Sequence, residues 1–155
     1  MNVNDTEVLI CNCGKTMPLD PKKISSGCNL KEPAEIYNSL CTDQINEVEK
    51  ALKNCSDENK PLLIACTHQA KLFSELAEEN EKEIPYLFNI RENAGWSKSA
   101  SNASSKISSI ILDASRMASS PEITRSMEFN SVGRCLIYGQ SDAVLNLANG
   151  LSEFL

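Results

Sequence analysis

Short apolar segments alternate with amphipathic segments along most of the chain. An apolar run rich in branched residues and bounded by turn-forming residues is typical of a buried strand, whereas apolar residues at helical spacing are typical of an amphipathic helix. On this basis strands are predicted at 7–11, 34–40, 61–66 and 84–90. Helices are predicted at 18–26, 42–54, 68–80 and 97–118.

Capping residues mark the predicted helix starts. Asp20, followed by a proline, is a typical N-cap, and Thr42 or Asp43 and then Thr67 precede the next two helices. The serine-rich stretch 97–118 looks low in complexity, but its alanine, isoleucine and methionine residues hold a helical spacing. We therefore predict an ordered surface helix there in preference to a disordered linker.

The pattern in the last part of the chain predicts two more strands and a helix. An edge strand at 126–131 turns at Gly133 into an apolar strand at 134–139, and Ser141 caps a final helix that runs to Leu155. The apolar end of that helix fits a docked C-terminal helix and equally the N-terminal module of a longer protein.

The alternation of strands and helices favours one class of fold. Short apolar strands joined by helices form parallel sheets whose two faces are both covered. We predict a single α/β domain over residues 1–155, with a small, doubly wound, mostly parallel sheet of about five strands and helices on both faces.

Composition narrows the classes of function. The chain has 155 residues and a net charge of −6, and it contains no apolar run near the ~18 residues that span a bilayer. Its N-terminus lacks a basic segment followed by an apolar core, so a cytoplasmic location is expected. The acidic balance argues against nucleic-acid binding, and the absence of an apolar span argues against membrane insertion.

Seven cysteines and a single histidine limit the chemistry further. An odd number of cysteines without a signal peptide argues against a secreted disulfide scaffold. The one histidine, His68, excludes a histidine-rich zinc site, and we expect it on the surface in the first turn of a helix.

Four of the cysteines lie at the ends of predicted strands. Cys11 and Cys13 end the first strand, Cys41 the second and Cys66 the third. The carboxyl ends of parallel strands share one edge, so these thiols converge if the first strand lies between the second and third. Four thiolates can hold a tetrahedral zinc ion or an iron–sulfur cluster. The spacing alone leaves open unrelated buried cysteines and a regulatory thiol pair, because free cysteine is often buried.

A set of motifs resembles a known family. They are C-N-C-G at 11–14, Y-x-x-x-C at 37–41, A-C-T at 65–67 and N-I-R-E-x-x-x-W at 89–96. In order and spacing they resemble the N-terminal domain of the flavin-containing subunit of heterodisulfide reductase and the similar front part of proteobacterial ferredoxin-type proteins with 4Fe-4S motifs, over residues 7–118. The resemblance implies a [4Fe-4S] cluster bound through a set of cysteines unlike that of ferredoxins. By position, the implied ligands are Cys11, Cys13, Cys41 and Cys66.

The chain departs from that family at several positions. It has no GxGxxG after a strand and no second run of cysteines, so we do not expect it to reduce a disulfide unaided. The segment after N-I-R-E reads N-A-G-W-S-K and lacks the family's cysteine and later histidine. The residues after Cys66 are T-H-Q instead of the family's Ser-Pro-Arg type, so no role of that loop beyond Cys66 is carried over.

Two further residues are expected at the cofactor. Arg91 follows the fourth strand, and a guanidinium beside a negatively charged cluster would favour the reduced form of the cluster. The alternative is an ordinary pairing of Arg91 with Glu92 or with an adjacent helix. Trp96 would shield the cluster from water, or simply pack in a loop. Backbone amides near Gly14 and Thr67 are candidate donors to the cluster sulfurs, because both turns are expected to lead into helices.

The remaining cysteines are expected outside the site. Cys135 is predicted in the core within a strand, and Cys55 in a polar loop. Cys28 is predicted to be a free thiol, although a turn near Cys13 would allow it to replace one of the ligands.

Together these features predict a non-catalytic electron-transfer component of an oxidoreductase. One [4Fe-4S] cluster would pass one electron at a time to or from a redox partner protein, or a downstream ferredoxin or flavin domain. The alternatives are a zinc-binding structural or interaction domain, a thiol-redox protein that uses Cys11 and Cys13, and a nucleotide-binding fold. The absence of a glycine-rich phosphate loop argues against the last of these.

Overall fold

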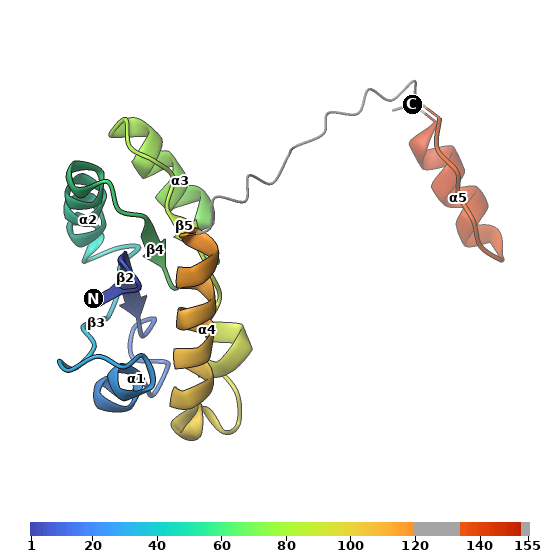
Figure 1. Cartoon of the computed structure of the whole chain (residues 1–155). Helices are drawn as coiled ribbons and strands as arrows, with labels where there is room; N and C mark the ends of the chain where they lie inside the picture. The colour runs from blue at the N-terminus through green and yellow to red at the C-terminus, as the bar shows by residue number, and fades with distance from the viewer. Residues whose placement is uncertain (120–133, 153–155) are drawn as a thin grey trace. The chain divides into compact units, whose positions relative to one another are not determined.

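The computed structural model describes residues 1–119 and 134–152. Contacts group the chain into two units, Met1–Pro121 and Glu122–Leu155. The first unit contains the sheet and helices α1 to α4, and the second contains α5 (Figure 1).

The sheet of the first unit is built around β2 (Thr6–Cys11). β2 pairs in parallel with both β3 (Ile36–Tyr37) and β4 (Leu62–Ile64), and β4 pairs in parallel with β5 (Tyr86–Leu87). The first predicted strand therefore lies between the second and the third, as the convergence of the cysteines requires. An antiparallel strand that was not predicted, β1 (Asn2–Val3), pairs with the start of β2.

The helices of the first unit alternate with the strands. They are α1 (Pro21–Gly27), α2 (Ile45–Glu58), α3 (Ala70–Glu79), a π-helix (Arg91–Gly95), a 3-10 helix (Ala100–Asn102) and α4 (Ser104–Ala118). Asp20 caps α1 as predicted, because its Oδ1 accepts hydrogen bonds from the backbone amides of Lys22 and Lys23 at 3.1 Å each.

The predicted caps of the next two helices are wrong. α2 begins after Gln44 and α3 after Gln69, and neither of these residues makes a side-chain capping bond. The residues between each strand and its helix form turns instead. In the first turn, Gln44 Oε1 accepts hydrogen bonds from the backbone amides of Asn38 and Ser39, at 2.6 and 3.1 Å.

Helices cover both faces of the sheet, which confirms the predicted fold class. Alternate residues of a strand point to opposite faces. Val8 and Ile10 of β2 belong to a core that includes Ile24 of α1 and Ile107 and Ile111 of α4. Leu9 lies in a second core, on the other face, that includes Val48 of α2 and Phe73 of α3. Residues 8–11 of β2 are apolar because both faces of the strand are buried there, whereas Thr6 and Glu7 at its start are polar.

The serine-rich segment forms an ordered helix, α4, as predicted, and several of its serines are buried. Ser104, Ser108 and Ser115 are all at most 6% exposed. Ser108 Oγ lies 2.9 Å from the carbonyl oxygen of Ser104 and 3.1 Å from that of Ile24 in α1. A Cβ at Gly27 of α1 would meet this hydroxyl. Small residues on both helices therefore permit a close approach.

Two predictions for the second unit, the strand at 134–139 and the core position of Cys135, are wrong. Residues 134–139, predicted as a strand, have no regular structure, and Leu136 and Tyr138 are 91% and 97% exposed. A strand needs a partner for its backbone groups, and within the described part of this unit none pairs with the segment. Cys135 is exposed and is not a core residue.

The final helix of the second unit forms largely where it was predicted. α5 spans Asp142–Leu151, after Ser141, which makes no side-chain capping bond. The predicted edge strand at 126–131 and the last residues of the predicted helix, 153–155, lie outside the described residues. Among the helices of the described ranges, none has the length and apolar character needed to cross a membrane.

Candidate functional site

A pocket of about 250 Å³ opens at the carboxyl ends of the parallel strands. Its lining comes mainly from four segments at strand ends: 11–17, which starts with the last residue of β2, 38–41 after β3, 65–69 after β4 and 89–92 after β5. Ligands in open α/β sheets bind at this edge, where neighbouring strands leave in different directions. Phe73 of α3 closes part of the pocket with an apolar side chain.

The four cysteines that end the predicted strands all line this pocket. Cys11 is the last residue of β2 and is buried, whereas Cys13, Cys41 and Cys66 are half-buried. Cys11 and Cys66 are distant in sequence, and the parallel pairing of β2 with β4 brings them to one edge.

The thiols surround the pocket without being closed around a common point. In the part of the chain that the structure describes, no three of the cysteine, histidine, aspartate and glutamate side chains are grouped tightly enough to hold a metal ion. A shared ligand would therefore require the cysteine loops to move inward. Cys13 and Cys41 lie on turns and Cys66 in an irregular loop, and of the four only Cys11 lies in a strand.

The loop that carries Cys13 has an unusual backbone. Cys13, Gly14 and Lys15 have φ values of 55°, 67° and 65°, so three consecutive residues are left-handed. The left-handed conformation costs free energy for residues with a Cβ, so three such residues in succession persist only where surrounding contacts hold them. A Cβ at Gly14 would meet no atom within 4 Å, so space does not require glycine at this position. Its positive φ is the feature that favours glycine.

Asn38, the residue after β3, holds this loop in place. Its carbonyl oxygen accepts a hydrogen bond from the Gly14 amide at 2.6 Å and one from the Cys11 thiol at 3.2 Å. Its side-chain oxygen accepts another from Asn12 Nδ2 at 2.8 Å. The Gly14 amide is thus directed to Asn38 and not to the pocket. The Cys13 amide donates to Cys11 Sγ at 3.3 Å instead, so one backbone donor does face a pocket sulfur.

The environment of Cys41 opposes the thiolate form. Burial raises the pKa of the Cys41 thiol above its ordinary value, and the neighbouring Cys11, Cys66 and Cys13 add to this as further negative charges once ionised. Several thiolates in one pocket therefore need a cation to offset their repulsion. A bound metal would supply it, and metal binding at such a site releases protons.

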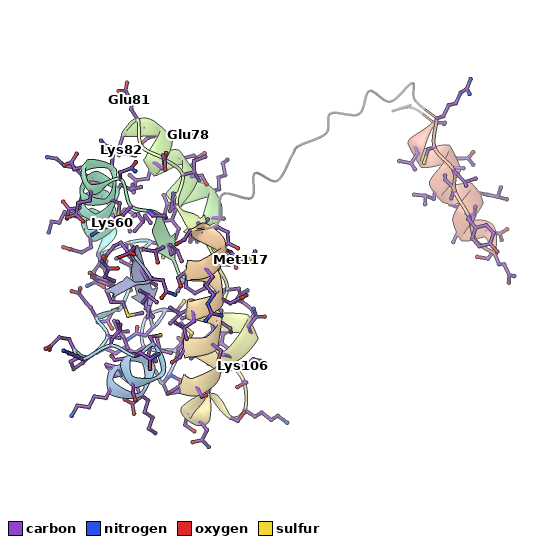
Figure 2. All side chains as sticks on the ribbon, viewed as in Figure 1. Lys60, Glu78, Glu81, Lys82, Lys106 and Met117 are labelled. Carbon is purple, nitrogen blue, oxygen red and sulfur yellow. The ribbon has the colours of Figure 1, made fainter. Side chains whose placement is uncertain are left out.

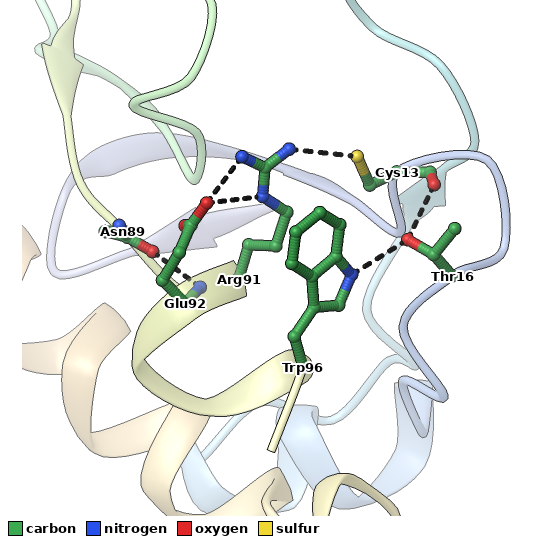
Figure 3. A network of polar contacts seen from close by, with 6 residues as sticks. All are labelled: Cys13, Thr16, Asn89, Arg91, Glu92 and Trp96. Atoms are coloured by element: carbon green, nitrogen blue, oxygen red, sulfur yellow. Dashed lines mark hydrogen bonds and ion pairs between the residues drawn. The ribbon is translucent and has the colours of Figure 1, made fainter.

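Arg91 brings a positive charge to the pocket. It opens the π-helix after β5, and its Nη1 donates a hydrogen bond to Cys13 Sγ at 3.5 Å (Figure 3). Its Nε donates to Glu92 Oε1 at 2.7 Å, and Nη2 contacts the same oxygen. These hydrogen bonds to Glu92 and Cys13 raise the pKa of Arg91 further above its already high value. The sequence offered a pocket role and an ion pair with Glu92 as alternatives, and the structure contains both contacts.

Trp96 lies outside the pocket, against Arg91. Its ring is 4.2 Å from Arg91 Cζ, and its Nε1 donates to Thr16 Oγ1 at 3.0 Å (Figure 3). The side chain is 53% exposed. It does not line the pocket, so any screening of a bound group would act through Arg91 and the loop of Cys13.

The other candidate residues are distributed as follows. Cys28 is buried between α1 and α4, away from the pocket, with its Sγ 3.9 Å from the carbonyl oxygen of Ser108. Cys55 is buried in α2 and not in a polar loop, and burial raises its pKa to about 11. His68 is exposed, as predicted, and contributes to the rim of the pocket together with Thr67.

Sequence reasoning missed the polar residues of the pocket. Asn38, Ser39, Gln69 and Asn89 line it alongside the cysteines. Each follows a strand closely, and the same strand-end position that selected the cysteines would have selected Asn38 and Asn89 too. Their roles depend on backbone groups that only the folded loops bring near them.

Fold and site together define a small α/β protein with a cysteine-lined pocket at the carboxyl edge of its parallel sheet. Comparison with protein-family models, with curated proteins and with solved structures found no significant match to this chain. The likeness to the flavin-containing subunit of heterodisulfide reductase rests on the sequence motifs alone.

Proposed function

We propose that the chain holds a [4Fe-4S] cluster through Cys11, Cys13, Cys41 and Cys66 and transfers one electron at a time. One observation supports this most. Four cysteines from three strand ends, distant in sequence, line a single pocket. All four also contact the hydrophobic cores, Cys11, Cys41 and Cys66 on one face of the sheet and Cys13 on the other, so the proposal rests on their convergence at one pocket.

The donor set suits the cluster. A [4Fe-4S] cluster takes four cysteine thiolates, and its irons supply the positive charge that offsets their repulsion. When bound, it supplies one-electron redox chemistry. The protein supplies the thiolates, the apolar wall at Phe73 and the amide of Cys13, which already donates to a ligand sulfur. Because the thiols are not grouped around one point, assembly of the cluster would require the loops that carry Cys13, Cys41 and Cys66 to move inward.

Arg91 would tune the potential of the cluster. A positive charge that donates to a ligand sulfur favours the more negative, reduced form and raises the reduction potential. The hydrogen bond from Arg91 to Cys13 Sγ is present without the cluster, so this group is positioned in advance. The ion pair with Glu92 and the stack on Trp96 hold the guanidinium in place.

Thiol-redox chemistry at Cys11 and Cys13 is the second candidate. The amide of Cys13 donates to Cys11 Sγ, and Arg91 donates to Cys13 Sγ, so both sulfurs receive hydrogen bonds suited to a thiolate. This interpretation assigns no role to Cys41 and Cys66, although both line the same pocket.

Anaerobic purification separates these two functions and a zinc site, because thiol-redox chemistry at Cys11 and Cys13 requires neither iron nor zinc. Iron, acid-labile sulfide and zinc are measured per chain, together with the absorption spectrum before and after reduction. We expect about four iron and four sulfide per chain, with broad absorption near 400 nm that bleaches on reduction. One zinc per chain with no iron after reconstitution would replace electron transfer by a structural or interaction role.

Single substitutions identify the ligands. Cys66→Ser and Cys41→Ser are expected to lower the iron content sharply, while Cys135→Ser, an exposed thiol in the second unit, serves as the matched control. Full iron content in Cys66→Ser and Cys41→Ser, with loss only in Cys11 and Cys13 variants, would contradict the four-cysteine site.

A further inference from the structure

Trp96 is an exposed aromatic side chain that is held in one orientation. It is 53% exposed, yet its ring stacks on Arg91 and its Nε1 donates to Thr16 (Figure 3). These two contacts come from different segments, the π-helix after β5 and the loop of Cys13. A large exposed aromatic residue with a fixed rotamer loses little entropy on binding, and tryptophan and arginine are the residues most enriched in interface hot spots.

Trp96 is also connected to the pocket. Arg91 contacts the tryptophan ring at 4.2 Å from its Cζ and Cys13 Sγ at 3.5 Å from its Nη1. Thr16, the hydrogen-bond acceptor of the ring, donates in turn to the carbonyl oxygen of Cys13 at 2.8 Å. Two short series of contacts therefore join a candidate cluster ligand to the surface at Trp96.

The two segments that meet at Trp96 carry three lysines, although the chain is acidic overall, and the nearby Glu92 is paired with Arg91. The segments 12–19 and 93–112 contain Lys15, Lys98 and Lys106 and no aspartate or glutamate, in a chain with a net charge of −6. All three lysines are exposed. Lys106 Nζ donates to the carbonyl oxygen of Asn93, at 2.6 Å, which places it beside the π-helix.

The far end of the first unit carries charges of both signs. Figure 2 shows Lys106 low on α4, and Glu78 and Glu81 together with Lys82 at the far end, where α3 terminates. A local group of positive charges orients an approaching partner of opposite charge and raises its rate of association.

We propose that Trp96, with Lys15 and Lys98 beside it, forms the docking surface for an acidic redox protein that exchanges one electron with a cluster bound at Cys13. This inference rests on the proposed cluster. The partner has a surface rich in carboxylates around its own redox centre. One electron passes from the reduced centre to the oxidised one, and no bond or proton is exchanged.

The test uses the full chain loaded with its cluster and an acidic plant-type [2Fe–2S] ferredoxin as the probe. The measured potentials of the two proteins fix which of them starts reduced, and stopped-flow absorbance gives the second-order rate constant. The double variant Lys15→Glu/Lys98→Glu is compared with Lys31→Glu/Lys53→Glu, which changes the net charge equally at exposed positions away from Trp96.

At low ionic strength we expect the Lys15→Glu/Lys98→Glu variant to be slower than the unmodified chain by about tenfold, with the difference shrinking as salt is added. The control pair should change the rate by less than about twofold, because its charges lie outside the docking surface. Trp96→Ala should slow the reaction at high salt too, since its contact is not electrostatic.

The outcomes distinguish the two proposals. A loaded chain whose Lys15→Glu/Lys98→Glu variant transfers electrons as fast as the unmodified protein, or no slower than the control pair, would overturn the docking surface and leave the cluster standing. A chain that assembles no cluster overturns both.

Discussion

Replacement of Gly27 by alanine tests the close packing of α1 on α4. Gly27 is the last residue of α1, and a Cβ there would meet Ser108 Oγ and lie 2.6 Å from Ser108 Cβ. Carbon atoms pack at roughly 3.5–4.0 Å, so the overlap is about an ångström. The hydroxyl can rotate away, but the Cβ of Ser108 is fixed to the backbone of α4. The two helices must therefore separate.

Overpacking of a core costs about 1–3 kcal/mol, while removal of a helical glycine returns about 0.5–1 kcal/mol. We expect Gly27→Ala to lower the free energy of unfolding by about 1–2 kcal/mol, measured by urea denaturation. Ser108→Gly removes both opposing atoms, so the double variant should be more stable than the sum of the single changes predicts. Ser109→Gly, at an exposed neighbour, should show simple additivity with Gly27→Ala. Stability of Gly27→Ala equal to that of the unmodified chain would refute the close approach.

Three further substitutions test the candidate site and the stability of the surrounding fold. Arg91→Gln should lower the midpoint potential of the bound cluster, by about 59 mV for each 1.4 kcal/mol of lost charge stabilisation, and an unchanged potential in a redox titration would exclude the tuning role. Burial raises the pKa of the Cys55 thiol from 9.0 to about 11, so the folded state keeps its proton longer than the unfolded state does. Stability should fall by about 2 kcal/mol between about pH 9 and 11, and this component should vanish from the pH dependence of Cys55→Ala. Asp20→Ala should destabilise the fold by about 1 kcal/mol in urea, whereas Asp43→Ala, which removes a predicted cap that is not used, should be nearly neutral.

The parts of the fold that depend on local pattern were predictable. Residues 8–11 of β2 and all of β4 form continuous apolar runs because both faces are covered there, and this pattern is visible in the sequence alone. α4 was predictable despite its serines, since isoleucine and alanine mark the buried face. β3 and β5 are shorter than their apolar runs because pairing extends for only two residues in each.

The parts that depend on distant partners were not predictable. Residues 134–139 have the apolar pattern of a strand, but a pattern does not supply a neighbouring strand. The prediction that Thr42 and Thr67 cap helices was wrong because the residues after β3 and β4 first form turns beside the pocket, and the helices start later. Within the site, the thiol positions followed from strand ends, whereas the hydrogen bonds of Asn38 and the stack of Trp96 on Arg91 required the folded loops.

A group bound to all four cysteines would link the segments that follow β2, β3 and β4. In the unfolded chain these thiols are far apart, so a ligand that needs all of them binds only the folded form and stabilises it. At a free ligand concentration of ~1,000 Kd the stabilisation is about 4 kcal/mol, which corresponds to an increase in Tm of roughly 10–20 °C for a unit of this size. Anaerobic thermal denaturation of the loaded and metal-free chains measures it. Loading without a change in Tm would mean that the metal is held within the Cys11–Cys13 loop alone, because only ligands from separate strand ends couple binding to the fold.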